Sequence, residues 1–272
     1  MKSRLAERGL NFLMFLFLYA PLLVMVFFSF NAGKSTSVFS GFSFYWYGEL
    51  FSSSDTMTAV RNTLLLALLS ATVATVMGTM AAVGVFRMRS RTASQTVMTV
   101  TNIPMMNPDI VTGVSLMLLF VFLGRLLGLA NSLSFWTLLI AHITFNLPYV
   151  ILNVLPKLRQ TDKHLTDAAL DLGCTQRQAF FKVVLPAIRP GVFAGWLMSF
   201  TLSLDDFVIS YYTNGADFQT LPLKIFAMTK KTVKPDMYAL STLIFVTILL
   251  LLILSNVLKN RSEEKARRGQ GS

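Results

Sequence analysis

GVFAGWLMSFTLSLDDFVISYY, residues 191–212, is an apolar run that holds two adjacent carboxylates, Asp205 and Asp206. About 20 mostly apolar residues suffice for a helix to cross about 30 Å of hydrocarbon. A charge inside such a span costs at least about 2.5–3.5 kcal/mol, and it marks a functional position by default. The run therefore predicts a membrane helix in which the two acids have a partner or a task.

The rest of the chain has the same membrane character. Of its 272 residues, 54% are hydrophobic and only 14% are charged, with a mean hydropathy of +0.59. A soluble domain carries about a quarter charged residues. We therefore predict an all-α membrane protein with six transmembrane helices, at residues 10–31, 60–86, 97–124, 134–156, 191–213 and 238–258.

The basic residues predict the orientation of these spans. If the N-terminus is cytoplasmic, the inside segments hold 17 of the 24 lysines and arginines, so both termini are expected in the cytoplasm. The net charge of +11 then reflects topology and contact with anionic membrane lipids, with no need for nucleic acid. The first apolar run is too long for a signal-peptide core and no cleavage site follows it, so a retained anchor is expected. We predict one permease domain, residues 1–260, and a disordered cytoplasmic tail, residues 261–272.

Motifs for catalysis or cofactor binding are absent from the sequence. The segment NAGKSTS, residues 31–37, ends like a phosphate-binding loop, but Phe28 stands where that pattern needs glycine, and a polar turn is the preferred interpretation. There is no HExxH, GxSxG or Cys/His cluster. The chain is therefore predicted not to be an enzyme and to hold no cofactor. If ATP and Mg²⁺ are used, another subunit must bind them.

The cytoplasmic loop between the fourth and fifth spans has two short amphipathic helices. The first has an apolar face formed by Leu165, Ala168, Ala169 and Leu172. Gly173 suits a left-handed cap after it, and Thr175 with Gln178 forms a capping box that starts the second helix, which Pro186 is expected to end. This helix–glycine–helix pattern favours docking to a cytoplasmic partner over a surface loop packed on the bundle.

This loop, DAALDLGCTQRQAFFKVVLP, resembles the EAA loop of ABC importer permeases. The matching positions are Asp167, Ala168, Ala169, Gly173, Val183, Leu185 and Pro186. Asp167 replaces the usual glutamate and Val183 the usual isoleucine. The resemblance implies the type I ABC importer permease fold, with a loop at residues 160–190 that inserts into a cleft of an ATPase subunit and transmits its closure.

Other segments narrow the resemblance to polyamine (spermidine/putrescine) importer permeases of the PotC type. They are YWYGELF, PDIVTGVSLMLLF, AHITFNLPYV, SFTLSLDDFVISYYTNG and LPLKIF. The resemblance implies a bacterial inner-membrane subunit that pairs with a homologous permease, an ATPase dimer and a periplasmic or lipid-anchored polyamine-binding protein. Two rival functions remain: a proton-coupled secondary transporter of organic cations using Asp205 or Asp206, and an ABC permease for a different solute.

The carboxylates are the candidate substrate ligands. Asp205 lies about 15 residues beyond Pro190, or roughly 22 Å along a helix, which predicts the outer half of the membrane. On a continuous helix, a polar stripe expected to line a wet pathway or the partner subunit comprises Ser199, Ser203, Asp206, Ser210 and Thr213. Asp206 is therefore favoured for ligand contact, and Asp205 for a second carboxylate or an interface pair.

Further polar and aromatic groups complete the predicted site. Asp109 follows Pro104 and Pro108, which can break the third span and free backbone carbonyls. Tyr211 and Tyr212 offer aromatic faces to the methylenes and ammonium groups of a polyamine. For His142 and Asn146, hydrogen bonding between helices is the preferred interpretation. For Tyr45, Trp46 and Tyr47, an interfacial aromatic belt is preferred over cation–π contacts to a ligand.

Overall fold

The computed structural model describes residues 2–33, 35, 38–129, 131–162, 164–230 and 235–269, with the backbone alone for helix residues 2–8, 251 and 254–269. Across these ranges the regular structure is helical, and the one recorded β-bridge joins Asn31 and Phe42. The chain divides into two compact units, Met1–Ala59 with Lys224–Leu250 and Val60–Leu223 with Leu251–Ser272. The single permease domain predicted for residues 1–260 stays a prediction.

The first unit contains two complete helices, α1 (Lys2–Phe28) and α2 (Tyr45–Ser52). It also holds parts of α3 (Ser54–Arg87), α11 (Leu221–Thr229) and α12 (Pro235–Gly269). The loop before α2 is organised by the buried Asn31, whose amide oxygen accepts hydrogen bonds from the backbone N–H groups of Gly33 and Ser40. The described residues around Asn31 thus form a turn, whereas Lys34, Thr36 and Ser37 of the phosphate-loop lookalike lie outside the described residues.

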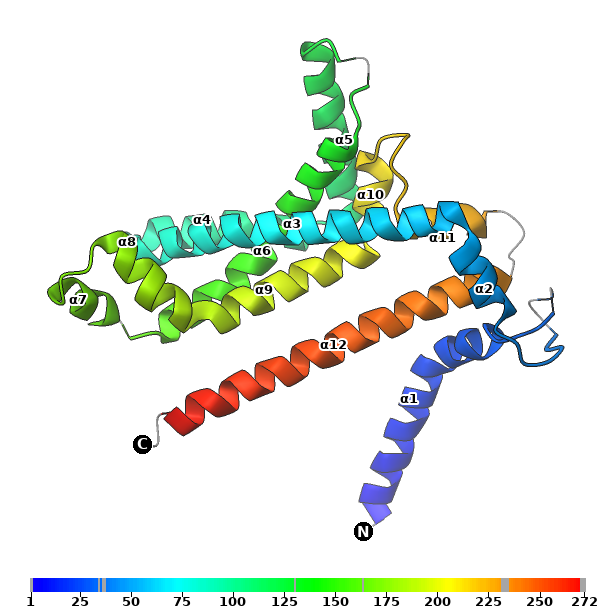
Figure 1. Cartoon of the computed structure of the whole chain (residues 1–272). Helices are drawn as coiled ribbons and strands as arrows, with labels where there is room; N and C mark the ends of the chain where they lie inside the picture. Colours follow the sequence, from blue (N-terminus) through cyan, green and yellow to red (C-terminus); the bar gives the residue numbers. More distant parts are fainter. Residues whose placement is uncertain are drawn as a thin grey trace. The chain divides into compact units, whose positions relative to one another are not determined.

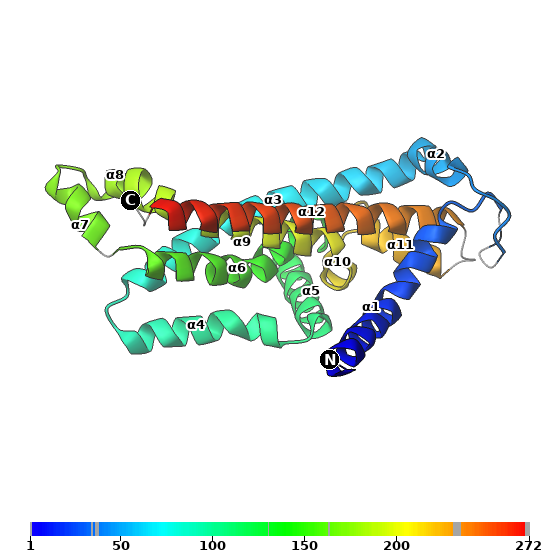
Figure 2. The same ribbon diagram turned by 90° about the horizontal axis from the view of Figure 1, so that it is seen from below.

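The second unit is a helix bundle that holds most of the predicted site (Figure 1). It contains most of α3 and then α4 (Arg91–Met106), α5 (Asp109–Leu126), α6 (Phe135–Gln160), α7 (His164–Asp171), α8 (Gln176–Ala179), the π-helix η1 (Phe180–Val184), α9 (Leu185–Asp205) and α10 (Val208–Thr213). Both views show α7 and α8 beyond one end of α6 and α9 (Figure 2).

Helices α6 and α9 pack closely because glycines on α9 have no side chain to separate them. A Cβ atom on Gly191 would lie 2.8 Å from the carbonyl oxygen of Asn153, and one on Gly195 would lie 3.2 Å from Cα of Val150. Around this contact lies an apolar core formed by Ala74, Ala82, Val150, Val154, Leu158 and Ile188. Burial of these side chains stabilises the packing of α3, α6 and α9.

In the part of the chain that the structure describes, five helices are long and apolar enough to cross a membrane. They are Gly9–Phe28, Ser54–Arg87, Asp109–Leu126, Phe135–Gln160 and Gln176–Asp205. Within α12, the stretch Pro235–Leu250 is a shorter apolar segment at the position of the sixth predicted span. The sixth span and the cytoplasmic location of both termini stay predictions. Residues 261–269 belong to α12, and residues 270–272 lie outside the described residues. The disordered tail stays a prediction.

Two predicted spans are broken helices. The third span is divided at Asn107 and Pro108, which have extended backbones with ψ of 142° and 136°, and α5 leaves α4 at a steep angle (Figures 1 and 2). The break that the prolines predicted is thus confirmed at Pro108, whereas Pro104 lies inside α4. The fifth span was expected to be one helix, and that is wrong: α9 ends at Asp205 and α10 begins at Val208.

Candidate functional site

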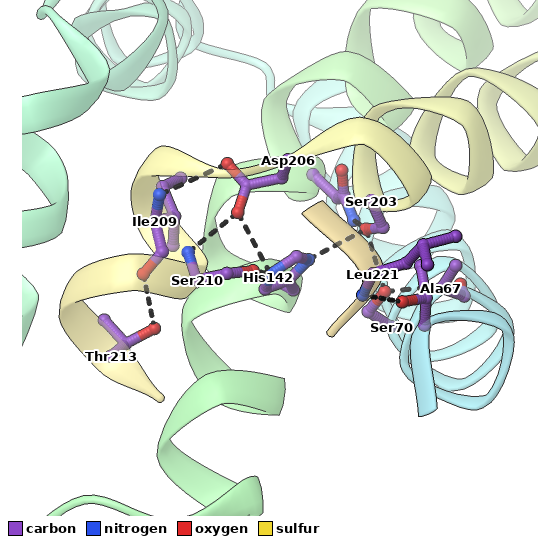
Figure 3. Close-up of polar contacts among 11 residues, drawn as sticks. Ala67, Ser70, His142, Ser203, Asp206, Ile209, Ser210, Thr213 and Leu221 are labelled. Carbon is purple, nitrogen blue, oxygen red and sulfur yellow. Dashed lines mark hydrogen bonds and ion pairs between the residues drawn. The ribbon is translucent and has the colours of Figure 1, made fainter. Parts of the chain in front are cut away.

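The side chain of Asp206 stabilises the break between α9 and α10. Asp206 has φ −63° and ψ 121°, so its backbone is extended and the helix cannot continue through it. Its carboxylate accepts hydrogen bonds from the N–H groups of Ile209 at 3.2 Å and Ser210 at 2.8 Å (Figure 3). These two N–H groups lie in the first turn of α10 and have no partner within the helix. The Asp206 carboxylate therefore caps α10.

The buried imidazole of His142 contacts both sides of this break. Its Nε2 atom lies 3.4 Å from the Asp206 carboxylate and 3.1 Å from the Ser210 hydroxyl, and its Nδ1 atom lies 3.1 Å from the Ser203 hydroxyl (Figure 3). The Ser203 hydroxyl also accepts a hydrogen bond from the amide of Asn146 at 2.7 Å and lies 3.0 Å from the Ser70 hydroxyl. The network joins α3, α6, α9 and α10.

This network confirms the interpretation of His142 and Asn146 as residues that bond between helices. It also brings in Ser70, which sequence reasoning missed, since an isolated serine in an apolar helix has no distinguishing neighbours. The amide oxygen of Asn146 is buried and has no hydrogen-bond partner among the described residues.

The prediction that the polar stripe lines a wet pathway or the partner subunit is wrong for this conformation. Its members Ser199, Ser203, Ser210 and Thr213 are 0–2% exposed, and the side chain of Asp206 is 7% exposed. The stripe was drawn on a continuous helix, whereas the break at Asp206 reorients the residues that follow. The chain itself covers the stripe.

The other predicted ligands lie in different surroundings. Asp205, the last residue of α9, and Asp109, the first residue of α5, are both exposed. Tyr211 is 48% exposed and forms an edge contact with Tyr212, the two ring centroids being 5.3 Å apart. Tyr212 packs on Gly113, where a Cβ atom would lie 3.0 Å from its ring. Each broken helix therefore carries an exposed acid beside its break.

Gly113 explains how the two broken helices come together. It lies four residues after Asp109, about 6 Å along α5, and a Cβ atom there would also lie 3.5 Å from the carbonyl oxygen of Val208 in the first turn of α10. The N-terminal turns of α5 thus pack directly on α10. Asp109 belongs to the same region of the unit as the break at Asp206.

The loop at residues 160–190 has the predicted helix–glycine–helix geometry. Gly173 has φ +84°, its N–H donates to the carbonyl oxygen of Leu170 at 2.9 Å, and the N–H of Cys174 donates to that of Ala169 at 3.0 Å. These two bonds form a Schellman cap at the end of α7. The Thr175 and Gln178 side chains each accept from the other's backbone N–H, at 3.3 and 2.9 Å, which confirms the capping box.

One detail of this loop differs from prediction. Pro186 does not end the second helix, because α8 continues through the π-helix Phe180–Val184 directly into α9. Pro186 is the second residue of α9, after the wide turn. Proline lacks an N–H and its ring clashes with the preceding turn of a regular α-helix. The π turn changes the hydrogen-bond spacing just before it, so the chain passes the proline without a loop.

The loop also presents apolar side chains outward. Leu172 is 86% exposed and Phe181 is 63% exposed. Asp167 and Ala168 are exposed on α7, whereas Ala169 is buried at 5% exposure; Leu185 and Pro186 are half-buried. The expected apolar face of α7 is thus only partly covered by the chain itself.

The aromatic segment before the second span is mostly engaged in internal packing. Trp46 is 8% exposed and its Nε1 donates to the carbonyl oxygen of Asn31 at 2.9 Å. The Tyr47 hydroxyl lies 2.8 Å from that of Ser29, and Tyr45 is 58% exposed. Within the described ranges, no group of three or more His, Cys, Asp or Glu side chains is placed to hold a metal ion.

The arrangement is similar to that of solved importers. A bacterial ABC transporter involved in the import of the acidic polysaccharide alginate matches with a TM-score of 0.72 at 17% identity, covering 96% of each chain. A methionine ABC transporter matches with a TM-score of 0.55 at 16% identity, over 77% of this chain and 98% of the other. The fold is therefore that of an ABC importer permease.

Sequence relatives narrow the assignment. The putrescine transport system permease protein PotI of Escherichia coli K12 is 39% identical over 94% of this chain and 93% of its own. The spermidine/putrescine transport system permease protein PotC is 38% identical in Haemophilus influenzae, over 92% of this chain and 95% of the relative, and 37% identical in Escherichia coli K12, over 99% of both.

The family model described as binding-protein-dependent transport system inner membrane component matches residues 74–268, and the chain belongs to this family. It is a multi-pass inner-membrane permease subunit and not an enzyme.

Proposed function

We propose that this chain is one of two permease subunits in an ATP-driven importer of polyamines, the spermidine/putrescine class. It has six spans with both termini in the cytoplasm, and it works with a homologous permease, an ATPase dimer that binds ATP and Mg²⁺, and an external polyamine-binding protein. The near full-length similarity to polyamine permeases supports the cargo.

One observation supports the location of the transport site. Two broken helices meet, and an exposed carboxylate lies at each break. Asp109 begins α5 after the Pro108 break, Asp205 ends α9, and α5 packs on α10 through Gly113. Transporters place cargo sites at the interruptions of discontinuous helices, where the backbone is freed from helical bonding. Two separated carboxylates match a flexible chain with an ammonium group every few carbons.

The proposed roles differ from the sequence-based interpretation, which favoured Asp206 for ligand contact. The site residues are Asp205, Asp206, Asp109, Tyr211 and Tyr212. Asp205, Asp109 and Tyr211 are exposed, so they contact the cargo: the acids bind ammonium groups and the ring covers methylenes. Asp206 and Tyr212 are positioning residues, since the first caps α10 and the second packs on α5. His142 holds Asp206 in place.

Coupling to the ATPase runs through the loop at residues 160–190, including Asp167, Ala168, Ala169, Gly173, Leu185 and Pro186. The exposed Leu172 and Phe181 offer the apolar contact surface. Because α8, η1 and α9 are continuous, a displacement of the loop reaches the break at Asp206 through one helical rod. ATP binding would turn the pathway outward, and hydrolysis would reset it.

The test of this function is the ATPase activity of the purified complete complex. The external binding protein is loaded with spermidine, with putrescine, with an amino acid or with an acidic oligosaccharide. Stimulation by the two polyamines alone is expected. Stimulation by another solute and not by polyamines would identify an ABC permease for different cargo. An absence of any binding-protein-dependent activity, in a complex that hydrolyses ATP, would refute the coupling scheme.

A further inference from the structure

A cavity lined by three arginines lies where α3, α4 and α6 meet. Its volume is about 900 Å³, within the range of ligand pockets. The arginines are Arg89, Arg91 and Arg159. Among the described residues, none of these guanidinium groups has a carboxylate within 4.0 Å. All three arginines are exposed. Like charges along one cavity wall without a counter-ion repel one another, so a bound anion would be stabilising.

Helix α4 adds to the positive potential of the cavity. Its N-terminus, capped by the Ser90 hydroxyl that accepts from the N–H of Ala93, lies at the cavity, and Ser94 and Gln95 line the wall. The first turn of α4 carries no acidic residue to offset the positive end of the helix dipole, and Arg91 increases it. Backbone N–H groups at such a terminus bind phosphate oxygens, and guanidinium groups bind them in bidentate fashion.

The remaining wall is apolar, and this favours a lipid over a soluble anion. Val85, Phe86, Met88 and Met98 line the cavity beside the arginines. Phe86 and Met88 are 37% and 40% exposed at the end of the candidate span Ser54–Arg87. An apolar wall next to a cationic one, at the end of a span, matches an acyl chain joined to a phosphate.

The position of the cavity gives its side of the membrane under the proposed topology. Arg159 lies in the last turn of α6, directly before the loop at residues 160–190. The cavity is therefore at the same end of the bundle as that loop, the cytoplasmic end, where anionic lipids attract basic residues. Its site is separate from the acids at the broken helices.

We propose that this cavity, named here the arginine pocket and lined by Arg89, Arg91 and Arg159, binds the headgroup phosphate of an anionic phospholipid of the inner leaflet, with Phe86 and Met98 against its acyl chains. Lipid bound there ties the α3–α4 turn to the end of α6 beside the coupling loop. The proposal is independent of the cargo.

The test compares two double variants of the complete importer, purified and freed of lipid. Arg89→Gln/Arg159→Gln changes the pocket, and Arg87→Gln/Arg61→Gln removes the same charge from exposed positions outside its lining and outside the loop at residues 160–190. Each complex is titrated with dioleoyl phosphatidylglycerol, with dioleoyl phosphatidylcholine and with soluble glycerol phosphate. Melting temperature and lipid retained in native mass spectrometry are measured.

Phosphatidylglycerol is expected to stabilise the parent and the control, and the pocket variant should bind it at least about tenfold more weakly. Equal loss in both variants would mean diffuse attraction to basic residues and would overturn the proposal. Stabilisation by glycerol phosphate equal to that by phosphatidylglycerol would indicate a soluble anion and would also overturn the proposal. Loss of ATPase subunits from the pocket variant alone would indicate a protein-docking surface and would overturn it as well. If the double variant does not assemble, Arg89→Gln and Arg159→Gln are each compared with Arg87→Gln on the same criteria.

Discussion

Replacing Asp206 and Asp205 one at a time distinguishes their roles. Asp206 is expected to support the structure and Asp205 to bind the cargo. Asp206→Ala removes the carboxylate that accepts hydrogen bonds from the N–H groups of Ile209 and Ser210 and that lies beside His142 Nε2. These buried groups then lose that partner. A hydrogen bond to a charged group contributes about 1.5–3 kcal/mol and loss of a helix cap costs about 0.5–2 kcal/mol. Because these terms are not additive, we expect a loss of about 2–4 kcal/mol.

Asp205 should respond in the opposite way. Asp205→Ala alters an exposed side chain for which no hydrogen bond to a buried group is seen among the described residues, so stability should change by no more than about 0.5 kcal/mol. Transport should fall roughly tenfold to a hundredfold, because a charge-assisted contact with an ammonium group is lost.

The assay measures thermal unfolding of the purified complex and, separately, polyamine uptake per assembled complex in proteoliposomes. Asp206→Ala should lower the melting temperature by roughly 5–10 °C for a chain of this size. Asp206→Asn should lower it less, since the amide oxygen still accepts one bond. An Asp206→Ala complex as stable as the parent would refute the capping role. Parental uptake by an assembled Asp205→Ala complex would refute cargo contact at that residue.

Three further changes test other parts of the account. Gly173→Val forces a β-branched residue into φ +84°, at a cost of at least about 1–2 kcal/mol, and should reduce the ATPase subunit that co-purifies while membrane insertion is kept. Gly113→Leu drives a side chain into Tyr212, 3.0 Å from the position of Cβ, and should destabilise the complex by about 1–3 kcal/mol in thermal unfolding. Burial lowers the pKa of the Lys224 ammonium group, although the nearby carboxylates of Asp55 and Asp236 partly offset this. As the pH rises, the folded chain therefore loses this proton before the unfolded chain does, and stability should rise with pH up to about 10.4. Lys224→Met should flatten this rise in melting curves recorded at different pH values.

Controls make these outcomes specific. Gly84 has open space around it and no positive φ, so Gly84→Val and Gly84→Leu should neither release the ATPase nor create a clash. Undiminished ATPase binding by Gly173→Val would contradict the coupling role of the loop. A Gly113→Leu complex as stable as Gly84→Leu would contradict the close packing of α5 on α10. An unchanged alkaline profile in Lys224→Met would remove Lys224 as its origin.

The loop at residues 160–190 was predictable because its signals are local. A glycine after an apolar-periodic segment predicts a left-handed cap, and Thr175 followed three residues later by Gln178 predicts a capping box; both are present. The break before Asp109 was predictable for the same reason, since Pro108 disfavours a helical conformation at Asn107.

The break at Asp206 was missed because its cause lies far away in the sequence. No proline or glycine occurs between Ser203 and Ser210, so the local pattern reads as one helix. The conformation is held by the imidazole of His142 on another helix, and only the fold brings it there. One local signal existed: an aspartate before an apolar turn can cap a new helix. In a membrane span this signal competed with the need for continuous backbone hydrogen bonding.

Uptake into proteoliposomes that contain the complete importer tests the central claim most directly. Spermidine or putrescine is supplied outside with the binding protein, ATP is clamped inside, and a protonophore is added to half of the samples. We predict uptake that requires both ATP and the binding protein and that is unchanged by the protonophore. Uptake that collapses with the protonophore at clamped ATP would contradict the account and favour a proton-coupled transporter of organic cations.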